Sequence, residues 1–296
     1  MWHYVRDDET EPRIGYRGID PRRLAAQLDR ICRVATPVGW SDLLAALAGD
    51  RALPGDAVIL TFDDGLMDHH RTVLPALVER GLPAIFFVLA RVPGDRLTLG
   101  HRLHVLTGSY APTNVRAWVM DAMTPSERAR YRALESAMAA AEPDDADDVW
   151  KRPLQRELAD VAGPILTSMV ERLIGPEAEI ATALHLGPRE IEDMAAAGMT
   201  IGGHGRAHAW MDVPGSAAAS EVAASAAYLG PRLPGPWPFA YPYGGVPTRP
   251  GPLLGRAGFG AAFSTGAGRR QDRYRIGRRD GDSTAAIDDW LVGAAP

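Results

Sequence analysis

VILTFDDG, residues 58–65, is an apolar run of strand length that stops at two adjacent carboxylates and a glycine. Apolar residues without polar alternation are typical of a strand buried on both faces, as in a parallel sheet, and Gly65 supplies the turn that ends it. Asp-Asp-Gly alone is an ordinary turn signal. Its place at the carboxyl end of a buried strand favours a functional site built around Asp63 and Asp64.

The composition describes a chain that can bury a large core. Its 296 residues, 46% of them hydrophobic, allow one large α/β domain or one domain with a sizeable insertion. The formal net charge of -5 argues against a nucleic-acid or anionic-membrane surface, because both need a concentrated basic face. Cys32 is the one cysteine, which excludes an intramolecular disulfide. Without a signal-peptide pattern or an apolar run of membrane-spanning length, a cytoplasmic protein with a small polar substrate is expected.

Predicted strands and helices alternate around the opening stretch. Residues 24–47 have apolar positions at helical spacings, interrupted at Pro37-Val38-Gly39, and His3 to Val5 is a candidate first strand. Residues 73–78 predict a helix, and the apolar run at residues 84–89 predicts a second buried strand. Strand, helix and strand in this order form a right-handed parallel unit.

The pattern changes between about residues 101 and 186 to helices rich in Ala, Arg and Glu. We interpret this segment as a helical insertion, or lid, within a single domain of residues 1–296. Thr124-Pro125-Ser126-Glu127 has the form of a capping box at a helix start. The acidic run at residues 142–148 is most simply a solvated loop, because it lacks the ligand spacing of a calcium-binding loop.

The sheet pattern resumes after the insertion. Further helices are predicted at residues 191–197 and 216–229. Further strands are predicted at residues 199–201, 260–264 and 274–276. The strand at 199–201 runs into Gly202-Gly203-His204, so a second strand ends in a potential metal ligand. Strands that alternate with helices and end in polar residues predict a barrel-like α/β fold with its active face at the carboxyl-terminal rim.

His204 and His208 stand four residues apart in a glycine-rich turn. Two imidazole nitrogens and one carboxylate oxygen make a good open site for zinc or a similar divalent ion. Taken alone, the pair is more simply explained as surface or capping histidines. Together with Asp63 and Asp64 at another strand end, a metal site becomes the better interpretation, because a cation relieves the repulsion between adjacent carboxylates.

Three motifs in this order resemble those of polysaccharide deacetylases, the NodB-homology group of carbohydrate esterase family 4. They are Thr61-Phe62-Asp63-Asp64-Gly65, His204-x-x-x-His208 and Tyr241-Pro242-Tyr243-Gly244. The likeness covers most of the chain outside the helical insertion. It implies a distorted (β/α) barrel and one divalent metal ion, with zinc expected first and cobalt, nickel or iron as alternatives.

The resemblance also implies residue roles. Asp64, His204 and His208 would hold the metal, and Asp63 would be the general base that acts on a metal-bound water. The tetrahedral oxyanion would lie between the metal and the backbone N–H of Tyr243.

The chain departs from the family pattern in its later motifs. Ala240 stands where the third motif usually has an arginine, and neither the acidic residue nor the tryptophan of the fourth motif is found between Tyr243 and Ile276. In the fifth motif, Ile276-Gly277-Arg278 replaces the expected Leu-x-His. Arg278 is therefore assigned either to the oxyanion or substrate, or, with Arg279 and Asp280, to the support of the base. A salt-bridged strand end is the structural alternative for each arginine.

The missing fifth-motif histidine leaves the proton donor to be found elsewhere. The available imidazoles are His3, His69, His101 and His104, and we place His69 and His3 first. Each of them is individually more typical of a structural histidine, and the metal-bound water or Asp63 itself is an alternative source of the returned proton.

Aromatic and glycine residues near the third motif are expected to contact the substrate. The expected substrate-binding residues are Tyr243, Tyr241, His3 and Gly244, with Trp210 and Trp237 as further members of an aromatic platform. Pyranose C–H faces pack well on such rings. Packing of the rings against proline-rich turns is the alternative.

The sequence thus predicts a divalent-metal-dependent N-deacetylase acting on an N-acetylated amino sugar or a sugar conjugate. Because a large potential lid accompanies the absence of an export signal, a small or carrier-linked substrate is expected rather than an exported polymer. Two alternatives stay open: a hydrolase of another cyclic or linear amide on the same scaffold, and a non-catalytic carbohydrate-binding relative. The intact Asp63, Asp64, His204 and His208 argue against the second.

Overall fold

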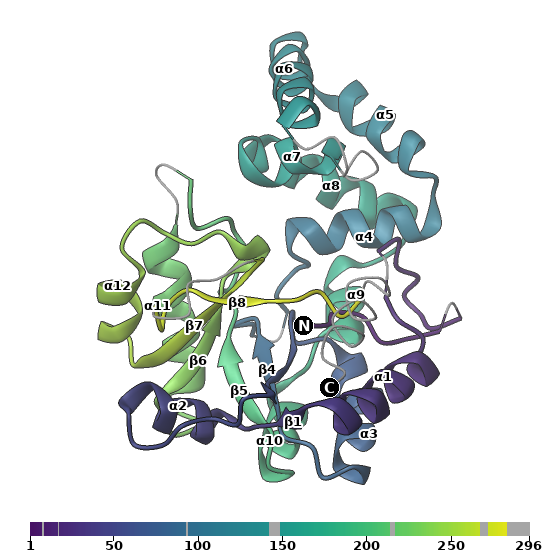
Figure 1. Ribbon diagram of the computed structural model, residues 1–296. Coiled ribbons are helices and arrows are strands. Elements are labelled where there is room, and N and C mark those ends of the chain that lie inside the picture. The colour runs from purple at the N-terminus through teal and green to yellow at the C-terminus, as the bar shows by residue number, and fades with distance from the viewer. Residues whose placement is uncertain are drawn as a thin grey trace.

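The computed structural model describes residues 1–7, 9–16, 18–92, 94–141, 149–213, 217–266 and 272–282. Six parallel strands form one sheet in chain order (Figure 1). They are β3 (Leu60–Phe62), β4 (Ala84–Val88), β5 (Thr200–Gly203), β6 (Trp237–Ala240), β7 (Phe259–Thr265) and β8 (Ile276–Arg278). Because each crossover adds the next strand on the same side, the sheet curls into a half-barrel whose edges are β3 and β8. The predicted barrel-like α/β fold is confirmed.

The opening stretch divides at Ile59. Its first part belongs to β2 (Ala57–Val58), which pairs with β1 (Thr36–Pro37) in a separate two-stranded sheet. Its last part is β3, which is buried throughout and pairs with β4. The buried strand predicted here therefore exists, but the part of it in the main sheet is shorter than the apolar run.

Residues 1–5 do not form the expected first strand, and make isolated parallel bridges instead. Trp2 pairs with Phe62 of β3, and the N–H of Gly281 donates to the Met1 carbonyl at 2.6 Å. The first residues therefore lie between β3 and the segment after β8. This position brings His3 to the carboxyl-terminal rim, between the two edges of the half-barrel.

Helices cover the outside of the sheet. Before and after β3 they are α1 (Pro21–Val34), α2 (Trp40–Ala48), the π-helical turn η1 (His69–Val73) and α3 (Leu74–Glu79). In the second half they are α10 (Pro188–Ala196), α11 (Ala218–Leu229) and α12 (Pro250–Arg256), while the short 3-10 turn η4 (Pro242–Gly244) lies at the carboxyl end of β6. The predicted break at Pro37 to Gly39 separates α1 from α2, and α11 begins at Ala218. The expected cap, Ser216, lies outside the described residues.

The segment predicted as an insertion is helical and stands above the carboxyl-terminal rim of the sheet in Figure 1. Its elements are α4 (Leu99–Ser109), α5 (Pro112–Ala122), α6 (Pro125–Ala141), η3 (Val149–Lys151), α7 (Arg152–Arg156), α8 (Ala159–Leu173) and α9 (Glu177–Leu184). They share an apolar core of their own that includes Leu103, Tyr131 and Leu166. Thr124 and Glu127 make the reciprocal bonds of the predicted capping box. The acidic run at 142–148 lies outside the described residues.

Both ends of the insertion contact the strand end that carries the two carboxylates. At its exit, the Leu186 N–H donates to the Gly65 carbonyl at 2.8 Å, and His185 forms an antiparallel bridge with Leu66. At its entrance, α4 places His101 beside Asp64. The insertion is therefore a wall of the rim as well as a cover over it.

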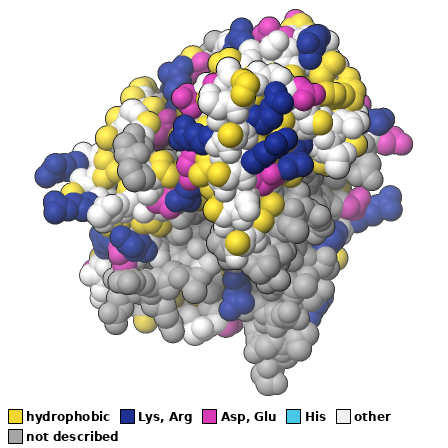
Figure 2. Space-filling model, turned by 90° about the horizontal axis from the view of Figure 1, so that it is seen from above, with side chains coloured by type: hydrophobic (Ala, Val, Ile, Leu, Met, Phe, Trp, Pro, Cys, Tyr) yellow, Lys and Arg dark blue, Asp and Glu magenta, His cyan; other side chains and the backbone are white. Residues whose placement is uncertain are grey.

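The surface of the insertion does not resemble a nucleic-acid interface. Seen from above in Figure 2, basic and acidic side chains are interspersed with apolar ones over this face. No helix in the described ranges is long and apolar enough to cross a lipid bilayer.

Candidate active site

The carboxyl ends of the parallel strands meet at one cavity of about 440 Å³. Asp63 and Asp64 follow β3, His204 follows β5, and Tyr241 follows β6. All four line this cavity together with His208. The topology of a parallel sheet thus collects residues that are up to 178 positions apart in the chain, as Asp63 and Tyr241 are.

Asp63 is held by a two-pronged ion pair with Arg278. Nη1 and Nη2 of Arg278 each donate to one Asp63 oxygen at 2.6 Å, and Nη1 also lies 3.3 Å from the Thr61 hydroxyl. Burial alone would raise the pKa of Asp63, but the charge of Arg278, followed by that of His204, holds this pKa well below its usual range. Asp63 is therefore an ionised carboxylate with fixed orientation at neutral pH.

The ion pair supplies an arginine to Asp63 although β6 has Ala240 at the position where an arginine was expected. Arg278 comes from β8 instead, and its guanidinium crosses the open side of the half-barrel to reach the end of β3. Both of its terminal nitrogens are committed to Asp63, so the geometry favours support of the base over contact with an oxyanion. Arg279 and Asp280, the other expected supports, are exposed.

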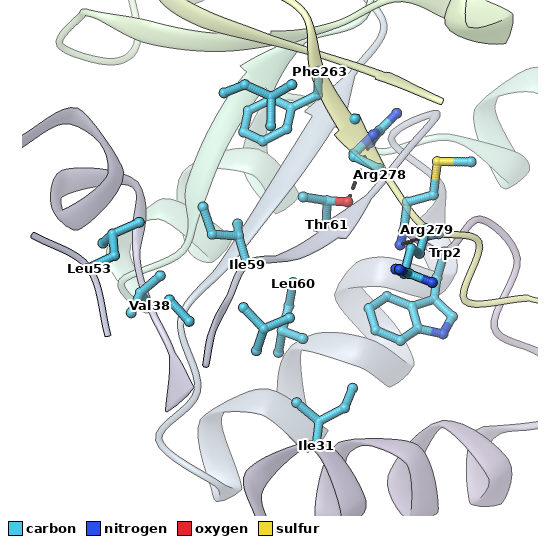
Figure 3. A pocket seen from close by; sticks show the side chains of 15 residues that line it. Trp2, Ile31, Val38, Leu53, Ile59, Leu60, Thr61, Phe263, Arg278 and Arg279 are labelled. Atoms are coloured by element: carbon cyan, nitrogen blue, oxygen red, sulfur yellow. Dashed lines mark hydrogen bonds between the residues drawn. The ribbon is translucent and has the colours of Figure 1, made fainter. Parts of the chain in front are cut away.

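A second cavity, of about 330 Å³, lies beside Arg278 in the gap between β3 and β8. Figure 3 shows that its labelled lining is mostly apolar and that Arg278 and Thr61 border it, joined by a hydrogen bond. The members of this lining include Ile31, Val38, Leu53, Ile59 and Phe263. An apolar surround offers Arg278 no competing anion, which strengthens its pairing with Asp63.

Asp64, His204 and His208 form a cluster that fits a divalent cation. One ligand atom from each lies within 4.8 Å of the others. Nε2 of His204 and Nε2 of His208 are 3.4 and 3.2 Å from Oδ1 of Asp64. Oδ1 is buried and makes no hydrogen bond within the described ranges, as expected of an atom that faces a metal position. Two nitrogens and one oxygen suit zinc and related ions, with coordination positions left for water and substrate.

A hydrogen bond from outside the cluster and unusual backbone angles orient the side chains of Asp64, His204 and His208. Nδ1 of His204 lies 2.8 Å from the Ala240 carbonyl, which fixes Nδ1 as the donor and leaves the lone pair of Nε2 for the cluster. Asp64 and His208 have φ of 75° and 53°, a left-handed conformation that non-glycine residues rarely adopt. Such strained residues cluster at functional sites. Burial lowers the pKa of His208 to about 4, so its imidazole is neutral and able to bind a metal.

The loop between the two histidines is fastened to α11. Oε2 of the buried Glu221 accepts hydrogen bonds from the N–H groups of Arg206 and Ala207, both at 2.9 Å. Gly205 has φ of 76°, and a Cβ on it would lie 2.4 Å from the same Oε2. The glycine is therefore required for the carboxylate to reach the loop, and the loop sets the position of His208.

His3 lines the cavity and is paired with Asp282, a residue that the sequence analysis did not identify. Nδ1 of His3 lies 2.7 Å from Oδ2 of Asp282. Burial alone would lower the pKa of His3, but the hydrogen bond and charge of Asp282 raise it to about 9. His3 is therefore an imidazolium at neutral pH. Asp282 lies two residues beyond Asp280, the acidic residue that was expected at the site. The sequence did not predict the path of the chain after β8, and this path brings Asp282 to His3.

His69 lies outside the cavity, although the sequence placed it among the first candidates for the proton donor. It is fully buried beside the stacked rings of Phe62 and Phe86, and its Nε2 lies 2.9 Å from the His3 carbonyl. Burial lowers its pKa, so it is neutral. The structure brings His69 to the backbone of His3 and not to the reacting groups.

The two other candidate donors come from the insertion. His104 lines the cavity, but burial holds its pKa well below the usual range, and its Nδ1 faces the Tyr4 hydroxyl at 3.1 Å. A neutral imidazole of this kind is a poor acid. His101 is buried beside Asp64 and does not line the cavity.

The expected aromatic residues divide into two groups. Trp210 and Tyr243 line the cavity and stack at 4.7 Å with an interplanar angle of 11°. The Tyr243 ring also contacts His208 edge-on at 4.4 Å, and the Arg156 guanidinium lies 4.6 Å from the Trp210 ring centre. The stack thus fixes one wall of the cavity beside His208.

The remaining residues of the expected platform have other contacts. Tyr241 is almost fully buried and donates its hydroxyl to the Tyr274 carbonyl. Gly244 has φ of 74°, and its Cα lies so close to Thr265 that a Cβ would be 2.1 Å from the Thr265 hydroxyl. Trp237 packs against Phe259 away from the cavity.

Polar residues of the insertion complete the lining, and these were also missed from sequence. They are Lys151, Arg152 and Gln155, joined by Tyr16 from the N-terminal region. A helical segment with mixed charges gives no signal of which residues face a site that is formed by distant strands. Tertiary placement of the insertion decides it.

Known proteins resemble this chain in one sequence segment and in overall fold. The family model described as Polysaccharide deacetylase matches residues 50–122. This range contains β3, the two carboxylates, β4 and the first helices of the insertion, while His204 and His208 lie beyond it. No curated protein sequence matches the chain significantly.

Solved structures of deacetylases share the fold over nearly the whole chain. IcaB from Ammonifex degensii has 20% sequence identity and a TM-score of 0.57, with 99% of this chain and 94% of that chain covered. The deacetylase PplD of Streptococcus pyogenes has 14% identity and a TM-score of 0.56, with 100% and 95% covered. A de-N-acetylase from Aggregatibacter actinomycetemcomitans has 15% identity and a TM-score of 0.57, with 94% and 91% covered.

Proposed function

We propose, from the match of residues 50–122 to the polysaccharide deacetylase family model, that this chain is a divalent-metal-dependent N-deacetylase of an N-acetylated amino sugar or sugar conjugate. The reaction would release acetate and a free amine. One observation carries the proposal: an ionised Asp63, clamped by Arg278, shares one cavity with a cluster of Asp64, His204 and His208. A base beside an open metal-ligand set is the arrangement that amide hydrolysis needs.

A divalent cation held by Asp64, His204 and His208 would polarise the acetamide carbonyl and acidify the attacking water. Zinc is the first expectation, because two imidazoles and a carboxylate suit it, with cobalt, nickel and iron as the alternatives. The orphaned Oδ1 of Asp64 supports this assignment.

Asp63 would accept one proton from the water as its oxygen bonds to the carbonyl carbon. Pairing with Arg278 makes the Asp63 carboxylate a weaker base. A weaker base is better suited to a water whose pKa has been lowered than to a bulk water. The tetrahedral oxyanion would be stabilised by groups of the cavity, among which we assign the backbone N–H of Tyr243.

His3 would donate the second proton to the amide nitrogen as the C–N bond breaks. It is an imidazolium that lines the cavity with Asp63 and Asp64, and Asp282 holds it. The water thus ends as one oxygen of acetate and the leaving nitrogen becomes an amine. His3 takes the place of the histidine that is absent from the fifth motif. The acetate bound in the PplD structure is the product expected here.

The substrate would be small or carrier-linked. The cavity of about 440 Å³ is of the size of a ligand pocket, and the insertion supplies Lys151, Arg152 and Gln155 to its lining. The stacked Trp210 and Tyr243 would offer their edges and exposed parts to a pyranose ring. We therefore propose that the insertion restricts the substrate.

A substrate panel tests the proposal directly. Metal content would be measured on the purified full chain, followed by acetate and amine release from N-acetylhexosamines, their lipid- or nucleotide-linked conjugates, short N-acetylated oligosaccharides and cyclic amides. Release from the sugar amides with one bound metal is the expected result. Turnover of the cyclic amides alone would replace the proposal by another amide hydrolase. Metal and sugar binding without turnover would indicate the non-catalytic relative.

A further inference from the structure

His101 is a buried imidazole with an unused nitrogen beside the metal-ligand cluster. It lies in the first turn of α4, the first helix of the insertion, and is 1% exposed. Its Nε2 makes no hydrogen bond within the described part of the chain and lies 3.4 Å from Oδ2 of Asp64. A buried polar atom without a partner requires an explanation.

The two carboxylate oxygens of Asp64 face different neighbours. Its Oδ1 faces Nε2 of His204 and Nε2 of His208 at 3.4 and 3.2 Å. Its Oδ2 faces His101. The outer oxygen of a ligating carboxylate is the atom that second contacts usually hold, and such contacts fix the orientation of the inner oxygen.

The contacts of His101 with Thr98 and Asp64 favour one tautomer of its ring. The Thr98 hydroxyl oxygen caps α4 by accepting from the His101 backbone N–H at 3.3 Å, and it lies 2.7 Å from Nδ1 of His101. The Asp64 oxygen that faces Nε2 can only accept, which favours the ring proton on Nε2 and leaves Nδ1 to accept from the Thr98 hydroxyl. Nδ1 is then the acceptor, and the ring proton is on Nε2, where it points towards Asp64. An Nε2 that carries a proton is a donor and not a metal ligand.

The other groups packed around His101 leave Asp64 as its partner. The rings of His185, His104 and His208 lie 4.6, 5.8 and 6.1 Å from it, and that of Tyr4 lies 6.3 Å from it. Nδ1 of His185 faces the Ala181 carbonyl, and Nδ1 of His104 faces the Tyr4 hydroxyl. Asp64 is the carboxylate that His101 reaches among the described residues.

We propose that His101 is a positioning residue for Asp64, whose outer oxygen it holds so that the inner oxygen faces the metal. This inference rests on the proposed metal-dependent function and adds a role for the insertion, whose first turn then completes the metal site. Thr98, the cap of that turn, would act through His101. Formation of α4 and formation of the metal site would in this way depend on each other.

Two amide substitutions separate this role from packing. In His101→Gln the side-chain amide nitrogen takes the place of Nε2 and keeps a donor towards Asp64. In His101→Asn the side-chain amide takes the place of Nδ1, where its oxygen can accept from Thr98, and it is too short to reach Asp64. We expect His101→Gln to bind Zn²⁺ within about threefold of the unchanged chain and His101→Asn to bind it roughly 10- to 100-fold more weakly, the usual loss for such outer contacts.

The measurement is a Zn²⁺ competition titration against a chromophoric chelator, with the full metal-free chain, and a Co²⁺ absorption spectrum of each variant. His185→Leu is the matched control, because it removes a buried imidazole from the same group without touching Asp64, and its Zn²⁺ affinity should stay within about threefold of the unchanged chain. An unchanged Co²⁺ spectrum in His101→Gln is expected.

Three results would overturn the inference. His101→Asn could bind Zn²⁺ as tightly as the unchanged chain, or His185→Leu could lose as much affinity as His101→Asn. His101→Gln could instead lose affinity together with a changed Co²⁺ spectrum, which would make His101 a metal ligand. Failure of the unchanged chain to bind any metal would contradict the proposed function itself, so the two failures are distinguishable.

Discussion

At the scale of single residues, the pairing of Asp63 with Arg278 is the main difference from the motifs that the chain otherwise resembles. Truncation of one partner leaves a buried charge, which costs about 3–5 kcal/mol. The pairing also gives Asp63 a fixed orientation although Ala240 stands on β6. An arginine on any element whose end reaches the same rim can orient the carboxylate, because a bidentate contact depends on the position of the guanidinium and not on its strand.

We predict that Arg278→Ala lowers kcat at least a hundredfold and destabilises the fold by about 3–5 kcal/mol. The pKa of Asp63 is depressed in the folded chain, so the stabilisation by the pair is present above the ordinary carboxyl pKa of 3.8 and is lost as the pH falls through the folded pKa. Loss of Arg278 raises that pKa and moves the acidic limb of the kcat profile to higher pH. Exposed Arg279→Ala is the control; equal effects of both substitutions would refute the assignment.

His3 gives a second prediction at this scale. Its pKa of about 9 places the basic limb of the pH–rate profile near pH 9 if its proton is transferred to the leaving amine. Asp282→Asn removes the pairing and should move this limb to lower pH, while His3→Asn should lower kcat by about 10²- to 10⁴-fold. His70→Gln, at a half-exposed histidine paired with Asp193, should leave the profile unchanged. A basic limb that stays near pH 9 in His3→Asn would exclude the role.

The pair of His3 and Asp282 also makes the stability of the fold depend on pH. The folded pKa of His3 is above its ordinary value of 6.5, so the stabilisation is fully present below pH 6.5 and is lost as the pH rises through about 9. Thermal unfolding of the metal-free chain across this window would measure it. Asp282→Asn should flatten that part of the profile.

At the scale of elements, α4 forms a wall of the site through its first turn. A Cβ on Gly100 would lie 2.9 Å from the Tyr243 hydroxyl. The Tyr243 ring has little freedom to move away, because it lies between His208 and Trp210. The glycine is therefore needed for the close approach of the insertion to the third motif.

We predict that Gly100→Ala lowers kcat/KM about tenfold or more by displacing Tyr243, since misplacement by an ångström can cost about a hundredfold. Gly163→Ala in α8 is the matched control, because no atom lies within 4 Å of the added Cβ. It should stabilise the chain by about 0.5–1 kcal/mol and leave kcat/KM unchanged. Steady-state kinetics with both variants checks this, and full activity of Gly100→Ala would contradict the described contact.

Sequence patterns predicted where the helices and strands lie in the chain better than they predicted which segments contact each other. Strand-length apolar runs and helical spacing indicated β3, β4, α1, α2 and α10, because burial on both faces and amphipathic periodicity are local properties. The first residues were expected as a strand, yet they make isolated bridges to Phe62 and Ile19. Pairing of that segment depends on the gap between β3 and β8, which exists only in the folded half-barrel.

At the scale of the whole molecule, the open half-barrel determines which residues meet. Asp63 and Asp64, with His204 and His208, could be predicted because motif and strand end coincide in the sequence. Asp282, His101 and the lining from α7 could not, since their roles follow from how the N-terminal segment and the insertion close over the rim. Long-range placement of this kind has no local sequence signal.

Metal binding should stabilise the whole molecule. Because the ligands come from β3 and the loop after β5, the assembled cluster requires the folded sheet. At a free Zn²⁺ concentration 100 times the Kd, the stabilisation would be about 2.7 kcal/mol, seen as a rise in Tm. His204→Ala should abolish this rise, whereas His70→Gln should retain it. A Tm that does not respond to Zn²⁺, Co²⁺, Ni²⁺ or Fe²⁺ would refute the metal site.

The most direct test of the central claim is acetate release from an N-acetylhexosamine conjugate by the metal-loaded chain, compared with its Asp63→Asn variant. Asn keeps the shape of Asp63 and removes the base, so the account predicts one bound metal in both proteins and a loss of kcat of about 10²- to 10⁴-fold in the variant. Undiminished acetate release by Asp63→Asn would contradict it.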